Sequence, residues 1–189
     1  MNVEIINFGG FEIKIGKLNE GYRYNAFKKG TDSQHFKNHE YFKSKEEALD
    51  YVKNKILEHN QTTLQKRVNG IPTAEEFVEA INAVKPTDGQ WAMLKAHFRA
   101  PERKLTSTQL AEAADYEHFY AANTQYGSLG SNIAHYLNFT PPGKYDDGKP
   151  LWITTITEDN HDNSEEDTGH FQHILREEVA EALKILGGI

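Results

Sequence analysis

The spacing of apolar residues changes along the chain, and this change limits the folds that the chain can adopt. In residues 11–15 apolar and polar side chains alternate, and the runs at 3–8 and 22–27 have a similar composition. Alternation with a period of two is typical of a β-strand with one buried face. After Ser44, apolar side chains instead recur every third or fourth residue, which is typical of amphipathic helices. The sequence therefore predicts an α+β protein whose strands come before most of its helices.

Residues 1–58 are predicted to form a small antiparallel β-sheet followed by one helix. A Gly-Gly pair at residues 9–10 separates the first two strands as a tight turn. A further short strand is expected near residues 39–42. Ser44 and Glu47 have the spacing of a capping box, which satisfies the free amides at the start of a helix. The first module is therefore a sheet of three or four strands with one helix.

Residues 59–72 are polar and end in glycine and proline, which is typical of a linker or of a fraying helix end. Residues 73–189 are then expected to form a mostly helical domain. Its most regular helix is predicted at 119–137, where apolar side chains recur at steps of three and four. Runs at 151–157 and 170–175 are predicted to pair as a β-hairpin before a last helix. The chain is therefore expected to hold two modules joined by a short linker.

The predicted order of the second module is helix, helix, turn, helix, β-hairpin, helix, and its local sequence supports this order. The string LTSTQLAEAADY at residues 105–116 resembles the first helix and turn of helix-turn-helix proteins, with Asp115 where that family usually has glycine. Residues 73–189 thus resemble a winged helix-turn-helix domain, which implies DNA binding. The strings WAMLKAH, LAEAADY, AANTQYGSLG and HILREEVAEAL are also similar to a bacterial module that sometimes accompanies HNH-type restriction endonucleases. That similarity implies an accessory or DNA-sensing role in a bacterium or phage, without nuclease activity, because the HNH motif itself does not occur.

A stretch of 26 residues, 118–143, contains no Asp, Glu, Lys or Arg, although the average composition would place about seven charges there. Neutral amide and hydroxyl side chains can hydrogen-bond to base edges, and asparagine or glutamine can pair bidentately with adenine. In a winged helix this stretch would occupy the position of the recognition helix. The predicted DNA-reading residues are His118, Tyr120, Asn123, Thr124, Gln125, Ser128, Ser131 and Asn132.

Other interpretations of the uncharged helix remain open. Small polar residues also suit a helix that packs between neighbours, including a neighbour in a second copy of the chain, so a homodimer is a candidate assembly. The same surface would also suit a small ligand or a catalytic site. Gly127 and Gly130 lie inside this helix, and each costs about 1 kcal/mol relative to alanine. We therefore expect either a close backbone approach or a break in the helix at the glycines.

Charge is distributed unevenly between the two modules. The whole chain has a net charge of −7, which divides into +3 for residues 1–70 and −10 for residues 71–189. DNA phosphates attract positive side chains, and basic residues with neighbouring aromatic rings can contact phosphates and stack on bases. The alternative is a solvated sheet face whose aromatic residues lie in the core. The phosphate-binding candidates are Arg99, Arg103, Lys104, Lys144 and Lys149 in the second module, and Arg23, Lys28 and Lys29, interleaved with Tyr22 and Tyr24, in the first.

Residues 158–169 oppose DNA binding, because they contain six acidic side chains and no Lys or Arg. In a winged helix this connection would be the wing, which usually lies near phosphates and would here be repelled by them. The alternative function is therefore an acidic protein-interaction module, an adaptor or inhibitor that binds a basic protein surface and does not bind double-stranded DNA.

Other functional classes lack support in the sequence. Without cysteine the chain forms no disulfide, thiol nucleophile or Cys-ligated metal site. No nucleophile-elbow, zinc-protease or phosphate-loop motif occurs, and His170 and His173 would point to opposite faces of a strand. We therefore expect a non-enzymatic protein without cofactor or metal. No apolar run reaches 18 residues and no basic region precedes an apolar run at the start, so we expect no membrane span, no secretory signal and a cytoplasmic location.

Overall fold

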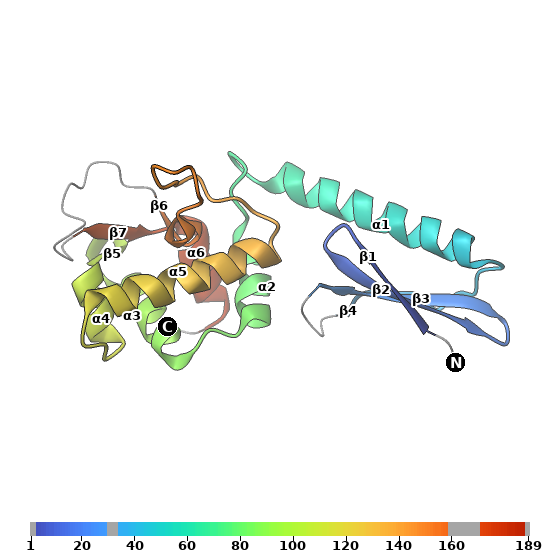
Figure 1. Cartoon of the computed structure of the whole chain (residues 1–189), viewed down its shortest axis with the longest axis horizontal. Helices are drawn as coiled ribbons and strands as arrows, with labels where there is room; N and C mark the ends of the chain where they lie inside the picture. The colour runs from blue at the N-terminus through green and yellow to red at the C-terminus, as the bar shows by residue number, and fades with distance from the viewer. Residues whose placement is uncertain (1–2, 30–33, 159–170, 188–189) are drawn as a thin grey trace. The chain divides into compact units, whose positions relative to one another are not determined.

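The computed structural model describes residues 3–29, 34–158 and 171–187. The chain forms two compact units, unit 1 (Met1–Gly70) and unit 2 (Ile71–Ile189) (Figure 1). Unit 1 is mainly a sheet and unit 2 is mainly helical with a small sheet, so the predicted α+β class is confirmed. Within the described ranges no helix has the length and apolar character needed to cross a bilayer.

Unit 1 is a four-stranded antiparallel sheet covered on one face by a long helix (Figure 1). The strands β1 (Val3–Phe8), β2 (Phe11–Leu18), β3 (Gly21–Lys28) and β4 (Gln34–Lys37) lie in chain order, and the helix is α1 (Lys45–Lys66). The alternation of β2 buries every second side chain against α1, as expected for a half-buried strand. This core consists of Phe11, Ile13, Ile15, Tyr24, Ala26, Phe42, Ala48, Val52 and Ile56.

The fourth strand of unit 1 lies at Gln34–Lys37 and not at the expected residues 39–42. Phe42 makes only an isolated bridge, with Tyr22. The close passage of this segment is visible at Gly21, where a Cβ atom would lie 2.5 Å from the carbonyl oxygen of Phe42. A residue with a side chain does not fit there, so glycine permits the return of the chain towards α1.

Helix α1 continues to Lys66, so residues 59–66 are the end of a helix, and the linker alternative does not hold for them. Its predicted start is observed, since the Ser44 hydroxyl accepts a hydrogen bond from the Glu47 amide. Part of the extension is explained by Asn60, whose side-chain amide donates to the carbonyl of Gly9 in the turn between β1 and β2 (2.9 Å). The extended part of α1 is held by this polar contact, which the apolar periodicity does not reveal.

Unit 2 packs its helices around one hydrophobic core, with a small antiparallel sheet beside them (Figure 1). The helices are α2 (Ala74–Val84), α3 (Asp88–Arg99), α4 (Ser107–Ala113), α5 (Phe119–Tyr136) and α6 (Glu177–Ile185). The strands are β5 (Lys104–Thr106), β6 (Thr157–Glu158) and β7 (Gln172–Leu175), in the sheet order β5-β7-β6. Capping boxes that begin with Thr73, Thr87 and Thr106 start α2, α3 and α4.

Helix α5 crosses the core of unit 2 without a break. Tyr126, Leu129 and Ile133 on its inner face are fully buried. A Cβ atom at Gly130 would lie 2.1 Å from the carbonyl oxygen of Trp152, so glycine allows another backbone to approach the helix there. At Gly127 a Cβ atom would meet nothing within 4 Å. A close backbone approach is therefore observed at Gly130 but not at Gly127.

The prediction of a strand at residues 151–157 is wrong for most of these residues. Trp152–Thr155 form a 3-10 helix, η2, and only Thr157–Glu158 pair with β7. The buried side chain of Arg176 accounts for this turn, because its Nε and Nη2 atoms both donate to the Thr154 carbonyl (3.1 and 2.9 Å). The predicted hairpin is consequently short, and β5, which sequence reasoning missed, completes a sheet of three strands.

Candidate functional site

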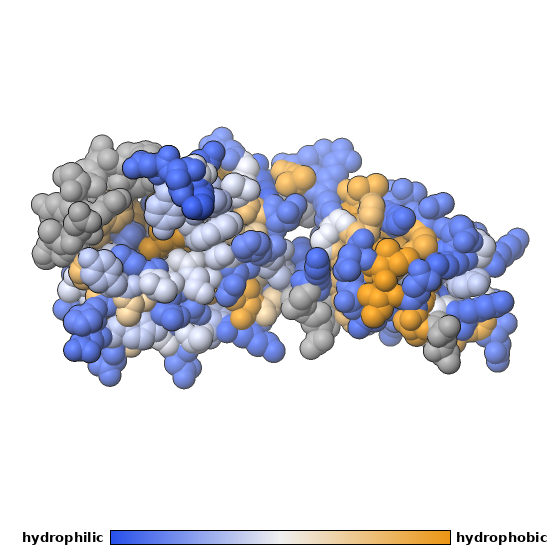
Figure 2. All heavy atoms as spheres, in the orientation of Figure 1, coloured by the Kyte–Doolittle hydropathy of each residue, from blue (hydrophilic) through white to orange (hydrophobic). Residues whose placement is uncertain are grey.

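Helix α5 presents one exposed, uncharged face to solvent. We define the exposed stripe of α5 as Tyr120, Thr124, Ser128, Asn132 and His135, which recur every three or four residues and are all exposed. Tyr120 has 65% of its surface exposed. On the face of unit 2 shown in Figure 2, the region over α5 is mainly pale or blue, as expected for neutral polar side chains. The stripe therefore offers hydrogen-bonding groups without net charge.

Two members of the exposed stripe also hydrogen-bond within their own helix. The Thr124 hydroxyl donates to the Tyr120 carbonyl (2.8 Å), and His135 Nδ1 donates to the Ser131 carbonyl (2.7 Å). The Thr124 oxygen keeps lone pairs with which it can accept from outside. Among the described residues no hydrogen bond is found for the Ser128 hydroxyl or the Asn132 amide, so these two groups are the most available for an external partner.

The remaining predicted reading residues lie in different surroundings. His118 is exposed at the start of α5, where it stands at the N-cap position without a side-chain capping bond. Gln125 is half-buried against α3, and its carbonyl accepts a hydrogen bond from the buried Gln90 side chain (3.1 Å). Asn123 and Ser131 are half-buried and line a pocket beside α5. The structure therefore brings the predicted residues onto α5 and its N-cap. Gln125 faces α3, Asn123 and Ser131 line the pocket, and Thr124, Ser128 and Asn132 belong to the exposed stripe and also line the pocket.

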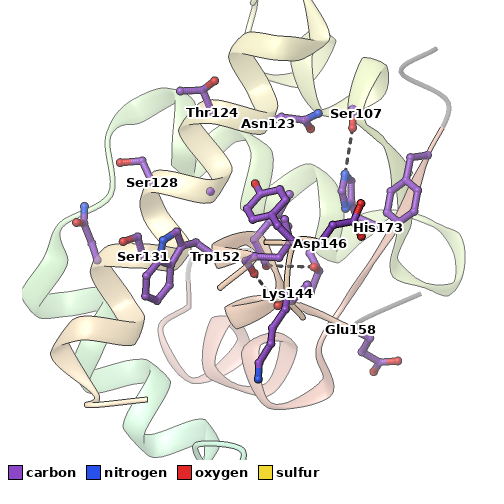
Figure 3. A pocket seen from close by; sticks show the side chains of 18 residues that line it. Ser107, Asn123, Thr124, Ser128, Ser131, Lys144, Asp146, Trp152, Glu158 and His173 are labelled. Carbon is purple, nitrogen blue, oxygen red and sulfur yellow. Dashed lines mark hydrogen bonds between the residues drawn. The ribbon is translucent and has the colours of Figure 1, made fainter. Parts of the chain in front are cut away.

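The pocket beside α5 has a volume of about 770 Å³, which is within the range of small-molecule sites (Figure 3). One wall is α5 and the opposite wall is the chain between residues 144 and 158. Ser107, Asn123 and His173 lie together at one end, whereas Ser128, Ser131 and Trp152 lie at the other. The three charged residues of the lining, Lys144, Asp146 and Glu158, are all exposed, so the inner surface is neutral.

A chain of buried, uncharged hydrogen bonds supports this pocket from behind. His97 Nε2 lies 2.9 Å from the His173 carbonyl, which can only accept, so this nitrogen carries the proton. His97 Nδ1 then accepts from the Tyr126 hydroxyl (3.0 Å). Burial lowers the pKa of His97 to about 4, and burial together with the nearby His97 lowers the pKa of His173 to about 3. Both rings are therefore neutral at pH 7, because the folded protein disfavours their charged forms.

Ser107 and His173 resemble a nucleophile and base in type, since Ser107 Oγ lies 3.0 Å from His173 Nε2. However, a histidine with a pKa of about 3 is a weak base. In the described part of the chain, no carboxylate hydrogen-bonds to His173 to orient it or to stabilise its cation. The geometry therefore favours a hydrogen-bonding role for this pair over nucleophilic catalysis.

The predicted phosphate-binding residues of unit 2 are mostly engaged with carboxylates. Ion pairs join Arg103 to Glu177, Lys104 to Glu102 and Lys149 to Asp147. Exposed ion pairs of this kind contribute only about 0–1 kcal/mol, so a phosphate can replace the carboxylate at low cost. Arg99 is exposed at the end of α3, and Lys144 is exposed at the rim of the pocket.

In unit 1 the predicted basic cluster is divided between two faces of the sheet. Arg23 and Lys28 are five residues apart on β3 and so project to opposite sides. The Arg23 guanidinium donates to the Asn38 carbonyl (2.9 Å), whereas the Lys28 ammonium lies over the ring of the core residue Phe11. Lys29 is exposed just after β3. Tyr24 is buried in the core and Tyr22 packs against it, which supports the solvated-sheet alternative for these aromatic residues.

Sequence reasoning missed the contribution of Ser107, His97 and His173 to this site. Ser107 lies within the string that resembles a helix-turn-helix, and His173 lies in a predicted strand, but the sequence predicts no site for either residue. Ser107 and His173 are 66 residues apart in sequence, and His97 and His173 are 76 apart, so no local motif connects them. The acidic segment after Glu158, with His161 and His170, lies outside the described residues. Within the described residues no group of three or more metal-binding side chains is found.

No family model, curated protein or solved structure matches this chain. The interpretation of the site therefore depends on its own geometry.

Proposed function

We propose that unit 2 is a winged helix-turn-helix domain that binds double-stranded DNA through α5. The element order α3, β5, α4, α5, β6, β7 and the sheet order β5-β7-β6 support this proposal, because α5 is the helix that follows the turn after α4, and the second helix of a helix-turn-helix is the one that reads bases. The observation that carries the proposal is the exposed stripe of α5, which is uncharged over its whole length and carries hydroxyl, amide and imidazole groups. Such groups distinguish base edges in the major groove.

The connection between α4 and α5 also suits a helix-turn-helix. Asp115 adopts a left-handed conformation (φ 56°), which is the conformation that glycine usually supplies in such a turn. Leu110 and Ala111 of α4 are buried in the same core as Ala122 of α5, so the two helices pack directly after the turn. The substitution of aspartate for glycine is therefore compatible with the fold, since aspartate tolerates this conformation better than most residues.

The distribution of charge indicates how binding would depend on salt. Four cations are candidates for phosphate contacts: Lys104 begins β5 and Arg103 precedes it, whereas Lys144 and Lys149 are exposed in the segment after α5. If each contacts one phosphate, the affinity falls by about 100-fold when salt rises from about 50 to about 200 mM. Because unit 2 carries a net charge of −10, we expect weak non-specific binding, and sequence preference has to come from the exposed stripe.

Fluorescence anisotropy with mixed-sequence duplexes at about 50 mM and about 200 mM salt tests this proposal. We expect binding at the lower salt and a loss of affinity at the higher salt. Replacing Lys144 and Lys149 by glutamine should make the logarithmic salt slope shallower by about two. Lys184→Gln is the matched control, because Lys184 pairs with Glu181 on α6. No binding at about 50 mM salt would favour the acidic adaptor that binds a basic protein surface.

A further inference from the structure

The pocket beside α5 is built for an uncharged ligand. Its charged lining residues, Lys144, Asp146 and Glu158, are exposed, and the histidine at its inner end is buried. A charged ligand beside Ser107, Asn123 and His173 would lose its hydration without gaining an opposite charge from these three residues. A neutral ligand with polar groups avoids that penalty.

Aromatic side chains in the lining favour a flat ligand. Tyr145, Trp152 and Phe171 all line the pocket, and Tyr145 has 57% of its surface exposed. Aromatic side chains bind planar heterocycles by stacking, and this interaction tolerates different ring substituents. The volume of about 770 Å³ is large enough for a heterocycle with an attached sugar.

One polar atom in the pocket wall lacks a partner. The Oδ1 atom of Asn123 is buried, and no group among the described residues hydrogen-bonds to it. Its neighbours at this end, Ser107 and His173, are bonded to one another (Figure 3). Buried polar atoms are nearly always hydrogen-bonded, so a ligand that carries an N–H donor would satisfy this oxygen once the Asn123 amide turns towards the pocket. Asparagine is also the side chain that pairs bidentately with the amine and ring nitrogen of adenine.

Gly127 leaves one wall of the pocket as bare backbone. A Cβ atom at this position would meet nothing within 4 Å, in contrast to Gly130, where the Trp152 carbonyl approaches. Packing within the described residues therefore does not require glycine at 127, although glycine weakens a helix. An open wall of this kind lets a flat ring lie against the helix.

The pocket and the exposed stripe of α5 share residues. Thr124, Ser128 and Asn132 are exposed on the helix and also line the pocket. We propose that the pocket binds a neutral nucleobase, held by stacking and by a hydrogen bond to Asn123. The base can come from a free nucleoside or from a DNA strand that lies along α5. The DNA source rests on the proposed function, that unit 2 binds DNA. A base must leave the stack to enter such a pocket, and this costs least at a mismatch.

The two tryptophans of the chain, Trp91 and Trp152, provide an optical test. Trp91→Phe leaves Trp152, in the pocket lining, as the single reporter. Each of the four deoxynucleosides is titrated into the full chain carrying this substitution. We expect saturable quenching of Trp152 emission by at least one of them.

Gly127→Leu adds a side chain that points into the open space of the pocket, and Asn123→Leu removes the amide. We expect each to weaken nucleoside binding at least tenfold, and Gly127→Leu to leave the urea midpoint unchanged or raised. Asn82→Leu, on the exposed side of α2, is the control that should bind as the parent does. If Gly127 has only a structural role, Gly127→Leu should lower the stability of the protein, whereas if it only blocks the pocket, it should lower nucleoside binding alone. Undiminished binding by Gly127→Leu would overturn the assignment.

Duplexes distinguish the two sources of the base. If the base comes from DNA, the protein should bind a duplex with one mismatch more tightly than the fully paired duplex. Gly127→Leu should abolish this difference without weakening the binding of the fully paired duplex. Nucleoside binding without any duplex binding would support the pocket with a free ligand and reject the proposed function. Duplex binding without nucleoside quenching and without a mismatch preference would reject the pocket assignment and leave the proposed function in place.

Discussion

Replacing Gly130 by alanine would place a methyl carbon 2.1 Å from the carbonyl oxygen of Trp152. Carbon–oxygen contacts normally begin at about 3.3 Å, so η2 or α5 would have to move by roughly 1 Å. The obstacle is backbone and not a flexible side chain, so it cannot rotate away. Gly127→Ala is the matched control, because it lies one turn earlier on the same helix and its Cβ atom meets nothing within 4 Å.

The expected free energies follow from two terms. Both substitutions gain about 1 kcal/mol from the higher helix propensity of alanine. Only Gly130→Ala incurs the cost of overpacking, which is typically about 1–3 kcal/mol. We therefore expect Gly127→Ala to stabilise unit 2 by about 1 kcal/mol, and the two variants to differ by about 1–3 kcal/mol.

Urea unfolding followed by tryptophan emission measures this difference in the right part of the chain, because Trp91 and Trp152 both lie in unit 2. For slopes of about 1–3 kcal/mol per molar urea, a difference of 2 kcal/mol separates the two midpoints by about 1 M. Equal midpoints would show that η2 does not approach α5 at Gly130, and this pocket wall would then be misplaced.

Two further predictions concern the buried histidines. The pKa values of His97 and His173 are lowered to about 4 and about 3 in the folded protein, so as pH falls the unfolded chain takes up these protons first. Stability is therefore complete above about pH 6.5 and decreases below it, by up to about 1.4 kcal/mol per pH unit for each histidine. Urea midpoints at pH 7 and pH 5 check this, and equal midpoints would contradict it. Tyr126→Phe leaves His97 Nδ1 without its donor and should destabilise unit 2 by about 1–3 kcal/mol in the same assay, whereas an unchanged midpoint would show that this bond contributes nothing.

The parts of the fold that depend on local pattern could be predicted from the sequence. The period-two run in β2 and the capping-box spacing at Ser44 give the first sheet and the start of α1 where they are observed. These features need only neighbouring residues. The position of α5 also followed from its apolar face, since Tyr126 and the other inner residues are buried as their spacing indicates, whereas its continuity through Gly127 and Gly130 did not follow from the sequence.

The parts that depend on distant contacts could not be predicted. Residues 151–157 have the composition of a strand, but Arg176 binds the Thr154 carbonyl and stabilises a 3-10 turn. Gln125 has the chemistry of a base-reading residue, yet its carbonyl is bonded to Gln90 of α3. In each case a contact between residues more than 20 positions apart overrides a local preference.

In the candidate site, too, the features set by local pattern were predictable and those set by distant contacts were not. The uncharged stretch located α5 as a helix with an unusual surface, and its exposed stripe is evident from spacing once the buried face is known. The pocket was not predictable, because its far wall comes from residues 144–158 and its inner end from Ser107 and His173. Their association depends on the close approach of η2 to α5, for which the glycine at 130 was the only local sign.

The most direct test of the central claim is selection from a random duplex library at about 50 mM salt, where phosphate contacts are strong enough to retain weak complexes. The variant to compare with the wild-type chain carries alanine at Thr124, Ser128 and Asn132, which keeps α5 helical and removes three of the five polar side chains of its exposed stripe. We expect the wild-type chain to enrich a defined sequence, and the variant to bind all duplexes equally with the wild-type salt dependence. Enrichment of the same sequence by the variant would contradict the assignment of α5 as the reading helix.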